Sequence, residues 1–214
     1  MRRGFLASIV AVLFVISGAS QVLTAESAAE DPMGAEEFIR QLSNDALGIL
    51  NDTTLTQDER DQAFRDLLKR GFALDYVSRL VLGRHGRTAS RAQLAEYDRV
   101  FPEYILRIYS SRLTEFGDEE IFVDGTAPAG KRDIYVRSKI IRPDGPPLAT
   151  DWRVRKIKGD FKVIDLKIEG ISMVITQRDE FLAKISSSGL DSLIADLKRQ
   201  AELDTAPAAK AAVE

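Results

Sequence analysis

The spacing of apolar residues changes twice along this chain, and this restricts the fold more than any other feature of the sequence. From residue 35 to 116 the apolar positions recur at the 3.6-residue spacing of helices. From 121 to 168 the composition is that of short strands, and from about 177 to 197 the helical spacing returns. This order predicts an α+β domain, with helices packed on one face of a mostly antiparallel four-stranded sheet.

Two helix starts are marked by a hydroxyl residue followed three positions later by Glu or Gln. Thr56 with Glu59, and Ser90 with Gln93, have the spacing of a capping box, in which each side chain satisfies a backbone donor of the first turn. The helix expected to start after Ser90 contains Pro102, which lacks a backbone donor. We expect either one kinked helix there or two helices joined near this residue.

The later elements are marked by turn residues. Asp124–Gly125 is expected to end a short strand at 121–123, and the stretch 158–160 to join two strands as a hairpin. Thr176 is expected to cap the helix that follows the strands, and Gly189 to interrupt it.

The first 25 residues have the pattern of a secretory signal peptide. Arg2 and Arg3 precede an apolar run from Phe5 to Ile16, and small residues follow, with a cleavage point after Ala25. The run is shorter than the ~20 residues that a membrane span needs. The predicted domains are a signal peptide (1–25), one folded domain (26–203) and a disordered, alanine-rich tail (204–214). An uncleaved N-terminal anchor is the alternative.

The composition excludes several kinds of chemistry. The chain has no cysteine, so disulfides, thiolate metal sites and cysteine nucleophiles are excluded, and a net charge of -3 argues against a general nucleic-acid binder. The single histidine, His85, lies in a polar stretch that predicts an exposed loop. No serine elbow, zinc spacing or phosphate loop is present. We therefore expect no catalytic residue, metal or cofactor.

One region of about a quarter of the chain has a specific pattern. It consists of Trp152-Arg153-Val154, Phe161 to Asp165, Glu169-Gly170-Ile171-Ser172-Met173-Val174, Gln177-Arg178, Phe181, Gly189-Leu190, Leu193-Ile194 and Leu197. This region resembles the C-terminal signature of the MlaC (toluene-tolerance) family. Phe161 and Gln177 depart from the family pattern, which often has tryptophan at the first position and an aromatic residue at the second.

The resemblance implies a periplasmic carrier that holds a phospholipid by its acyl chains and is not an enzyme. It would shuttle this lipid between an outer-membrane lipoprotein complex and an inner-membrane ABC transporter with its MCE-type substrate-binding component, which maintains the lipid asymmetry of the outer membrane. One branch of the family accompanies hopanoid biosynthesis, so a hopanoid-related cargo stays open.

A lipid carrier needs an apolar cavity and no reacting group. Each buried CH₂ is worth about 0.8 kcal/mol, so a ~16-carbon chain is worth roughly 13 kcal/mol, which the cavity has to match. We expect the cavity between the sheet and the helices, although each lining residue has ordinary core packing as its alternative. The candidates are Phe72, Tyr76, Phe101, Tyr104, Ile105, Ile108, Leu113, Val136, Ile140, Trp152, Val154, Ile164, Ile168 and Met173.

The strand region is also basic. Between Lys131 and Lys167 the sequence has eleven basic and five acidic residues. Strand alternation places Arg153 and Arg155 on one face, where they are candidates to meet a lipid head group or an acidic partner. A solvated outer face of the sheet is the alternative.

Two further functions stay open from the residues alone. A protein-interaction adaptor of the envelope would have a solid core, and a carboxylate hydrolase would need an acidic pair that forms only in space.

The export prediction is tested by mass spectrometry of the protein recovered from a Gram-negative periplasm. We expect a mature chain that begins close to residue 26. A mature chain that still begins near Met1 would show that the N-terminal segment is an anchor.

Overall fold

The computed structural model describes residues 31–113, 119–143 and 145–202, without the side chains of 111–113. The predicted signal peptide and the predicted tail from 204 onward lie outside these residues. The helices are α1 (Pro32–Leu50), α2 (Gln57–Gly71), α3 (Leu74–Leu82), the short 3-10 helix η2 (Gly83–Arg87), α4 (Arg91–Leu113) and α5 (Met173–Glu202). The strands are β1 (Glu120–Pro128), β2 (Asp133–Ile141), β3 (Leu148–Ile157), β4 (Asp160–Ile168) and β5 (Ile171–Ser172).

The α+β class is confirmed, but the described sheet has five strands and not four. Its order is β1-β2-β3-β4-β5, and every pair is antiparallel. The fifth strand was missed because β5 has only two residues, Ile171 and Ser172, and follows a tight turn at Gly170. A strand this short has no readable alternation.

Both capping boxes are confirmed. Thr56 accepts from the backbone of Glu59, whose carboxylate accepts from the backbone of Thr56. Ser90 and Gln93 exchange the same two bonds at the start of α4. Pro102 does not divide α4, which is one helix. The buried side chains around the proline hold the helix together through tertiary packing.

Three other expectations were wrong in detail. β1 does not end at Asp124–Gly125, because its pairing with β2 continues past a bulge between Val123 and Thr126 that holds one extra residue. Residues 83–87 form the η2 helix, in which His85 is half-buried and not exposed. α5 begins at Met173, before Thr176, although Gly189 does break its helical geometry at φ 83°.

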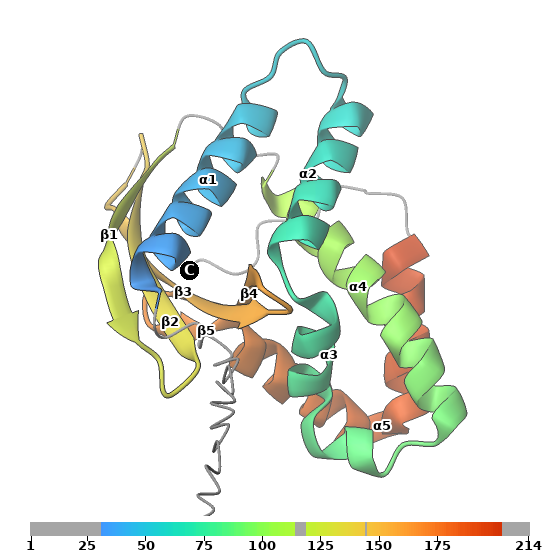
Figure 1. The fold of residues 1–214 in the computed structure, drawn as a ribbon. Coiled ribbons are helices and arrows are strands. Elements are labelled where there is room, and N and C mark those ends of the chain that lie inside the picture. Colours follow the sequence, from blue (N-terminus) through green and yellow to red (C-terminus); the bar gives the residue numbers. More distant parts are fainter. Residues whose placement is uncertain (1–30, 114–118, 144, 203–214) are drawn as a thin grey trace, which may run out of the picture.

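The described interior contains two apolar clusters. The sheet cluster lies between one face of the sheet and the helices α1 and α2 (Figure 1); its buried members are Ala35, Ile39, Leu42, Leu50, Phe64, Leu67, Ile134, Val136, Val154 and Val163. The helical cluster joins α3, α4 and α5; its buried members are Val81, Leu82, Tyr97, Val100, Phe101, Tyr104, Phe181, Leu193, Ile194 and Leu197.

Helices α1 and α2 approach closely where α2 ends. Gly71 is buried, and a Cβ atom at this position would lie 2.7 Å from Cδ1 of Leu42 in α1. The buried side chain of Leu42 occupies the space beside Gly71 and would have to shift to admit a methyl group there.

Replacing Gly71 by alanine should lower the free energy of unfolding by about 1–2 kcal/mol, because the methyl group overpacks the contact with Leu42. The matched control is Gly48→Ala in α1, where the new methyl group meets nothing within 4 Å. The control should raise stability by about 0.5–1 kcal/mol through helix propensity. Urea denaturation compares them, and equal effects of the two substitutions would refute the packing argument.

Candidate functional site

The predicted cavity residues are divided between the two clusters. Phe72, Val136, Trp152 and Val154 belong to the sheet cluster or pack against it. Phe101, Tyr104, Ile105 and Ile108 belong to the helical cluster or pack against it. The structure therefore gathers eight of the fourteen candidates into two apolar groups rather than one continuous lining.

Between α2 and α3 the chain passes from the sheet cluster, against which Phe72 packs, to the helical cluster, against which Val77 packs. Phe72 contacts the ring of Trp152 edge-on, with ring centroids 6.5 Å apart. The next residue, Ala73, donates its backbone N–H to the carbonyl of Val163 at 3.0 Å. Nearby, Lys69 of α2 lies 3.5 Å from the carboxylate of Glu103 in α4. We call the contact zone around Phe72 and Trp152 the cluster boundary.

A small polar network holds Trp152 in place on the inner face of the sheet. Its Nε1 donates to Oγ of Ser138 at 2.9 Å, and Ser138 and Thr150 share a hydroxyl contact of 2.6 Å. Both hydroxyl residues are buried and face each other across β2 and β3. Sequence reasoning missed them, although alternation from Val136 places Ser138 on the same inner face.

The β4 candidates are displaced by an irregularity in pairing. Val154 pairs with Val163, whereas Arg153 pairs with Asp165, so β4 carries one extra residue between them, Ile164. Ile164 is buried, but Val163 is the buried β4 residue of the sheet cluster. An alternation of inward and outward side chains counted back from Ile168 assumes a regular strand and therefore cannot detect this bulge.

The remaining lipid-contact candidates that the structure describes belong to neither cluster. Ile140, Ile168 and Met173 are half-buried. Tyr76 lies beneath the guanidinium of Arg155, 4.7 Å from the ring centroid. The side chain of Leu113 lies outside the described part of α4. All of them stay predictions as lipid contacts.

The two basic candidates both bind one buried carboxylate. Asp133 accepts from Nε of Arg153 at 2.8 Å, and from Nε and Nη2 of Arg155 at 2.5 and 2.9 Å. The predicted common face is therefore confirmed, because both side chains reach the same residue of the neighbouring strand. Their guanidinium groups are engaged within the protein, and contact with a head group or partner stays a prediction.

The ion pairs control the titration of Asp133. Burial alone would raise the pKa of this carboxyl, but hydrogen bonds and positive charge from Arg155 and Arg153 outweigh burial and lower its pKa. The same hydrogen bond to Asp133 raises the pKa of Arg155. The cluster of three charges joins β2 to β3 on the outer face of the sheet.

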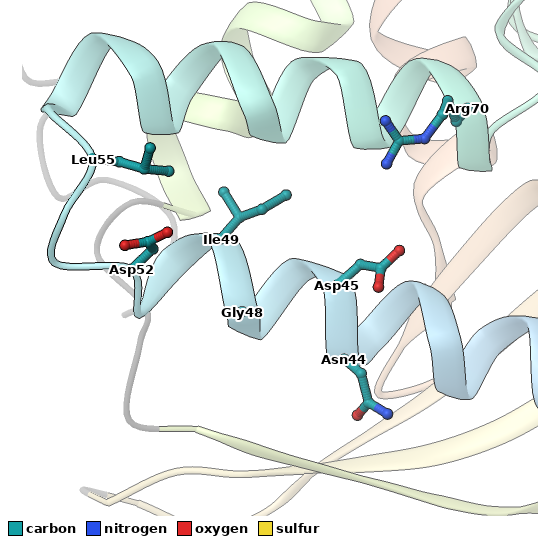
Figure 2. Close-up of a pocket in the computed structure, with 7 residues that line it drawn as sticks. All are labelled: Asn44, Asp45, Gly48, Ile49, Asp52, Leu55 and Arg70. Atoms are coloured by element: carbon teal, nitrogen blue, oxygen red, sulfur yellow. The ribbon is translucent and has the colours of Figure 1, made fainter.

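Two surface pockets of the described chain are lined by neither Phe72 nor Trp152. The first, of about 410 Å³, lies between α1 and α2. Figure 2 shows Arg70 of α2 on one side of it and Asp45 and Asn44 of α1 on the other. The second, of about 370 Å³, is lined by residues of α3, η2 and α4, among them Tyr97 and Asp98. Neither has the purely apolar lining that an acyl chain needs.

No helix among the described residues is both long and apolar enough for a bilayer span. No three His, Asp or Glu side chains among them gather closely enough to hold a metal ion.

The distinctive C-terminal sequence pattern has a structural explanation. Asp165 accepts from Oγ of Ser172 at 2.7 Å and from the backbone of Val174 at 3.1 Å, while Ser172 accepts from the backbone of Ile175 at 3.1 Å. These bonds satisfy free donors at the start of α5. The cap is thus Ser172, supported by Asp165, and not Thr176.

The fold and the boundary define an α+β protein in which helices cover one face of an antiparallel sheet and the apolar interior is divided in two. Residues 40–199 match the model of the MlaC protein family, and the chain belongs to this family. The resemblance inferred from residues 151–197 is thereby confirmed.

Three known proteins are similar to the chain. The intermembrane phospholipid transport system binding protein MlaC of Haemophilus influenzae is 26% identical over 132 residues, which cover 60% of this chain and 62% of that protein. The toluene tolerance protein ttg2D of Pseudomonas putida is 25% identical over 185 residues, which cover 84% and 83%. A phospholipid-binding protein from Ralstonia solanacearum, solved in complex with a phospholipid, matches with a TM-score of 0.67 at 22% identity, over 78% of this chain and 96% of that one.

Replacing Asp133 by asparagine should lower the free energy of unfolding by about 3 kcal/mol at pH 7, because two arginines lose their buried counter-charge. The folded pKa of Asp133 lies below its ordinary value of 3.8. The stabilisation is therefore complete above that value and is lost as the pH falls through the folded pKa. Denaturation at several pH values should show wild type and variant converging below about pH 4.

The matched control is Asp124→Asn, which removes the partner of Lys139 in an exposed ion pair. We expect it to change stability by less than about 0.5 kcal/mol. A loss in Asp133→Asn no larger than in this control would contradict the role assigned to the buried carboxylate.

Proposed function

We propose that this protein is a periplasmic carrier that holds a phospholipid by its acyl chains at the cluster boundary. It shuttles the lipid between outer- and inner-membrane complexes of an Mla-type ABC transport system and so maintains outer-membrane lipid asymmetry. The bound phospholipid is cargo, and the protein performs no catalysis. The observation that carries the proposal is the division of the apolar interior into two clusters, each with half-buried apolar side chains packed against it.

The boundary has the chemistry that acyl chains require. Phe72 and Trp152 pack against the sheet cluster, Ile105 and Ile108 pack against the helical cluster, and all four side chains are only partly buried. Partly buried apolar side chains next to two packed cores gain free energy when hydrocarbon covers them, at about 25 cal/mol for each Å² removed from water. A chain inserted between the clusters therefore extends the existing core.

Hydrogen bonds within the protein fix the side chains around the boundary without a bound lipid. The Ser138–Thr150 network fixes Trp152 on β3, and the Asp165–Ser172 cap fixes the start of α5. The helical and sheet clusters each have their own fully buried residues. The half-buried side chains at the boundary can thus move to admit an acyl chain while the buried residues of each cluster keep their packing.

The relatives support the choice of cargo and compartment. One is named for phospholipid transport between membranes, and the similar solved structure is a complex with a phospholipid. A carrier between two membranes works in the periplasm, which agrees with the predicted signal peptide. The partners that follow from this role are an inner-membrane ABC transporter with an MCE-type component and an outer-membrane lipoprotein complex.

The only tryptophan of the chain, Trp152, provides a direct test. The protein is loaded with a phospholipid whose acyl chains are brominated at mid-chain, and Trp152 fluorescence is measured. We expect strong quenching relative to the same lipid without bromine, because the chains lie against the indole ring. Native mass spectrometry of the same samples reports how much protein carries lipid.

The matched control moves the reporter to the outside of the sheet. Trp152→Phe combined with Phe122→Trp places the only indole at an exposed position of β1, where Phe122 is 55% exposed. This variant should bind the brominated lipid without quenching. Loaded wild-type protein with unquenched Trp152 would place the chains elsewhere, and failure to load any phospholipid would refute the carrier function.

A further inference from the structure

Two hairpin turns lie side by side at one end of the sheet. The β1–β2 turn and the β3–β4 turn are at the same end because the strands are consecutive and antiparallel. The pairing of Asp133 with Arg155 brings the two turns next to each other. The N-terminus of α1 is also here, since the carboxylate of Asp31 lies 3.8 Å from Nζ of Lys156.

This end of the protein is strongly basic. We call its cationic residues outside the Asp133 cluster the basic end; they are Lys131, Arg132, Lys156, Lys158 and Lys162. The carboxylate of Asp133 is buried and neutralised by Arg153 and Arg155. Asp31 and Asp160 are the other carboxylates of the two turns and the adjoining helix start. The five cations thus exceed the nearby acids, in a chain whose net charge is -3.

The opposite end of the sheet differs in charge. The described residues there include Glu119 and Glu120 at the start of β1 and Glu169 in the β4–β5 turn. Arg142 adds one cation in the β2–β3 loop, where it donates to the carbonyl of Pro146. Of the two ends of the described sheet, the one with the β1–β2 and β3–β4 turns therefore has the larger excess of positive charge.

The composition of the basic end favours a membrane over a protein partner. Protein interfaces are depleted in lysine and depend on a buried aromatic or aliphatic centre. Four of the five cations here are lysines, and Lys131, Arg132 and Lys158 are exposed on the turns. Clusters of lysine and arginine without such a centre are attracted to anionic lipid head groups. The exposed Met33, in the first turn of α1, adds a side chain suited to the head-group layer.

We propose that the basic end docks the protein on the surface of an anionic phospholipid bilayer. This proposal concerns the outside of the molecule and goes beyond cargo binding at the cluster boundary. The attraction acts over about 10 Å at 0.1 M salt and weakens as ionic strength rises. Docking orients the protein with its two hairpin turns toward the lipid surface.

Co-sedimentation with vesicles tests the proposal on the mature full-length protein. Vesicles of phosphatidylcholine alone are compared with vesicles that also contain phosphatidylglycerol, at low and at high salt. We expect binding only to the anionic vesicles, and release at high salt. The double variant Arg132→Glu/Lys158→Glu should bind at least roughly tenfold less, because two exposed cations of the basic end are reversed.

The matched control is Arg84→Glu/Arg87→Glu, which makes the same change of net charge at exposed positions of η2. It should bind anionic vesicles within about twofold of wild type. Thermal unfolding verifies that both variants are folded. Equal losses in the two double variants would mean that only net charge matters, and would overturn the proposal.

Wild-type protein that fails to sediment with anionic vesicles at low salt would also overturn it. In that case, binding to an acidic protein would be measured instead. If Arg132→Glu/Lys158→Glu lost this binding and the control variant kept it, the basic end would bind an acidic protein surface and not a membrane. Native mass spectrometry of both double variants separates this proposal from the carrier function, because cargo content should stay at the wild-type level. Loss of vesicle binding with normal cargo is the expected result for the basic-end variant.

Discussion

The direction in which α5 leaves the sheet depends on the carboxylate of Asp165, which is almost fully buried on β4. It accepts hydrogen bonds from Ser172 and from the backbone of Val174, so the first turn of α5 is tied to the strand that precedes it. From this start α5 carries Phe181 and Leu197 against α3 and α4 and completes the helical cluster. This joint thus ties the helix that completes the helical cluster to the sheet that carries the other cluster.

The sequence predicts those parts of the structure that depend on neighbours in the chain. The capping boxes at Thr56 and Ser90 locate two helix starts because all of their bonds form within four residues. The continuation of β1, the two-residue β5 and the bulge at Ile164 depend on partner strands, which local spacing does not report. For the same reason the candidate lining was predicted as one surface, whereas tertiary packing divides it between two clusters.

The two faces of the sheet separate the interior from the charges. On the inner face, the polar atoms of Ser138 and Thr150 bind each other and Trp152, so the wall stays apolar toward its surroundings. On the outer face, Arg153 and Arg155 neutralise Asp133. In the proposed function, hydrocarbon therefore lies on the inner side of the sheet, whereas the charged groups lie on the outer side and at the turns.

The central claim is that the apolar interior holds the acyl chains of a phospholipid while the protein is in water. Native mass spectrometry and lipid extraction on protein purified from its own envelope test it most directly. The account predicts a phospholipid that stays bound through chromatography, in a fixed ratio to the protein. Protein that is consistently empty, and that takes up no lipid from liposomes, would contradict it.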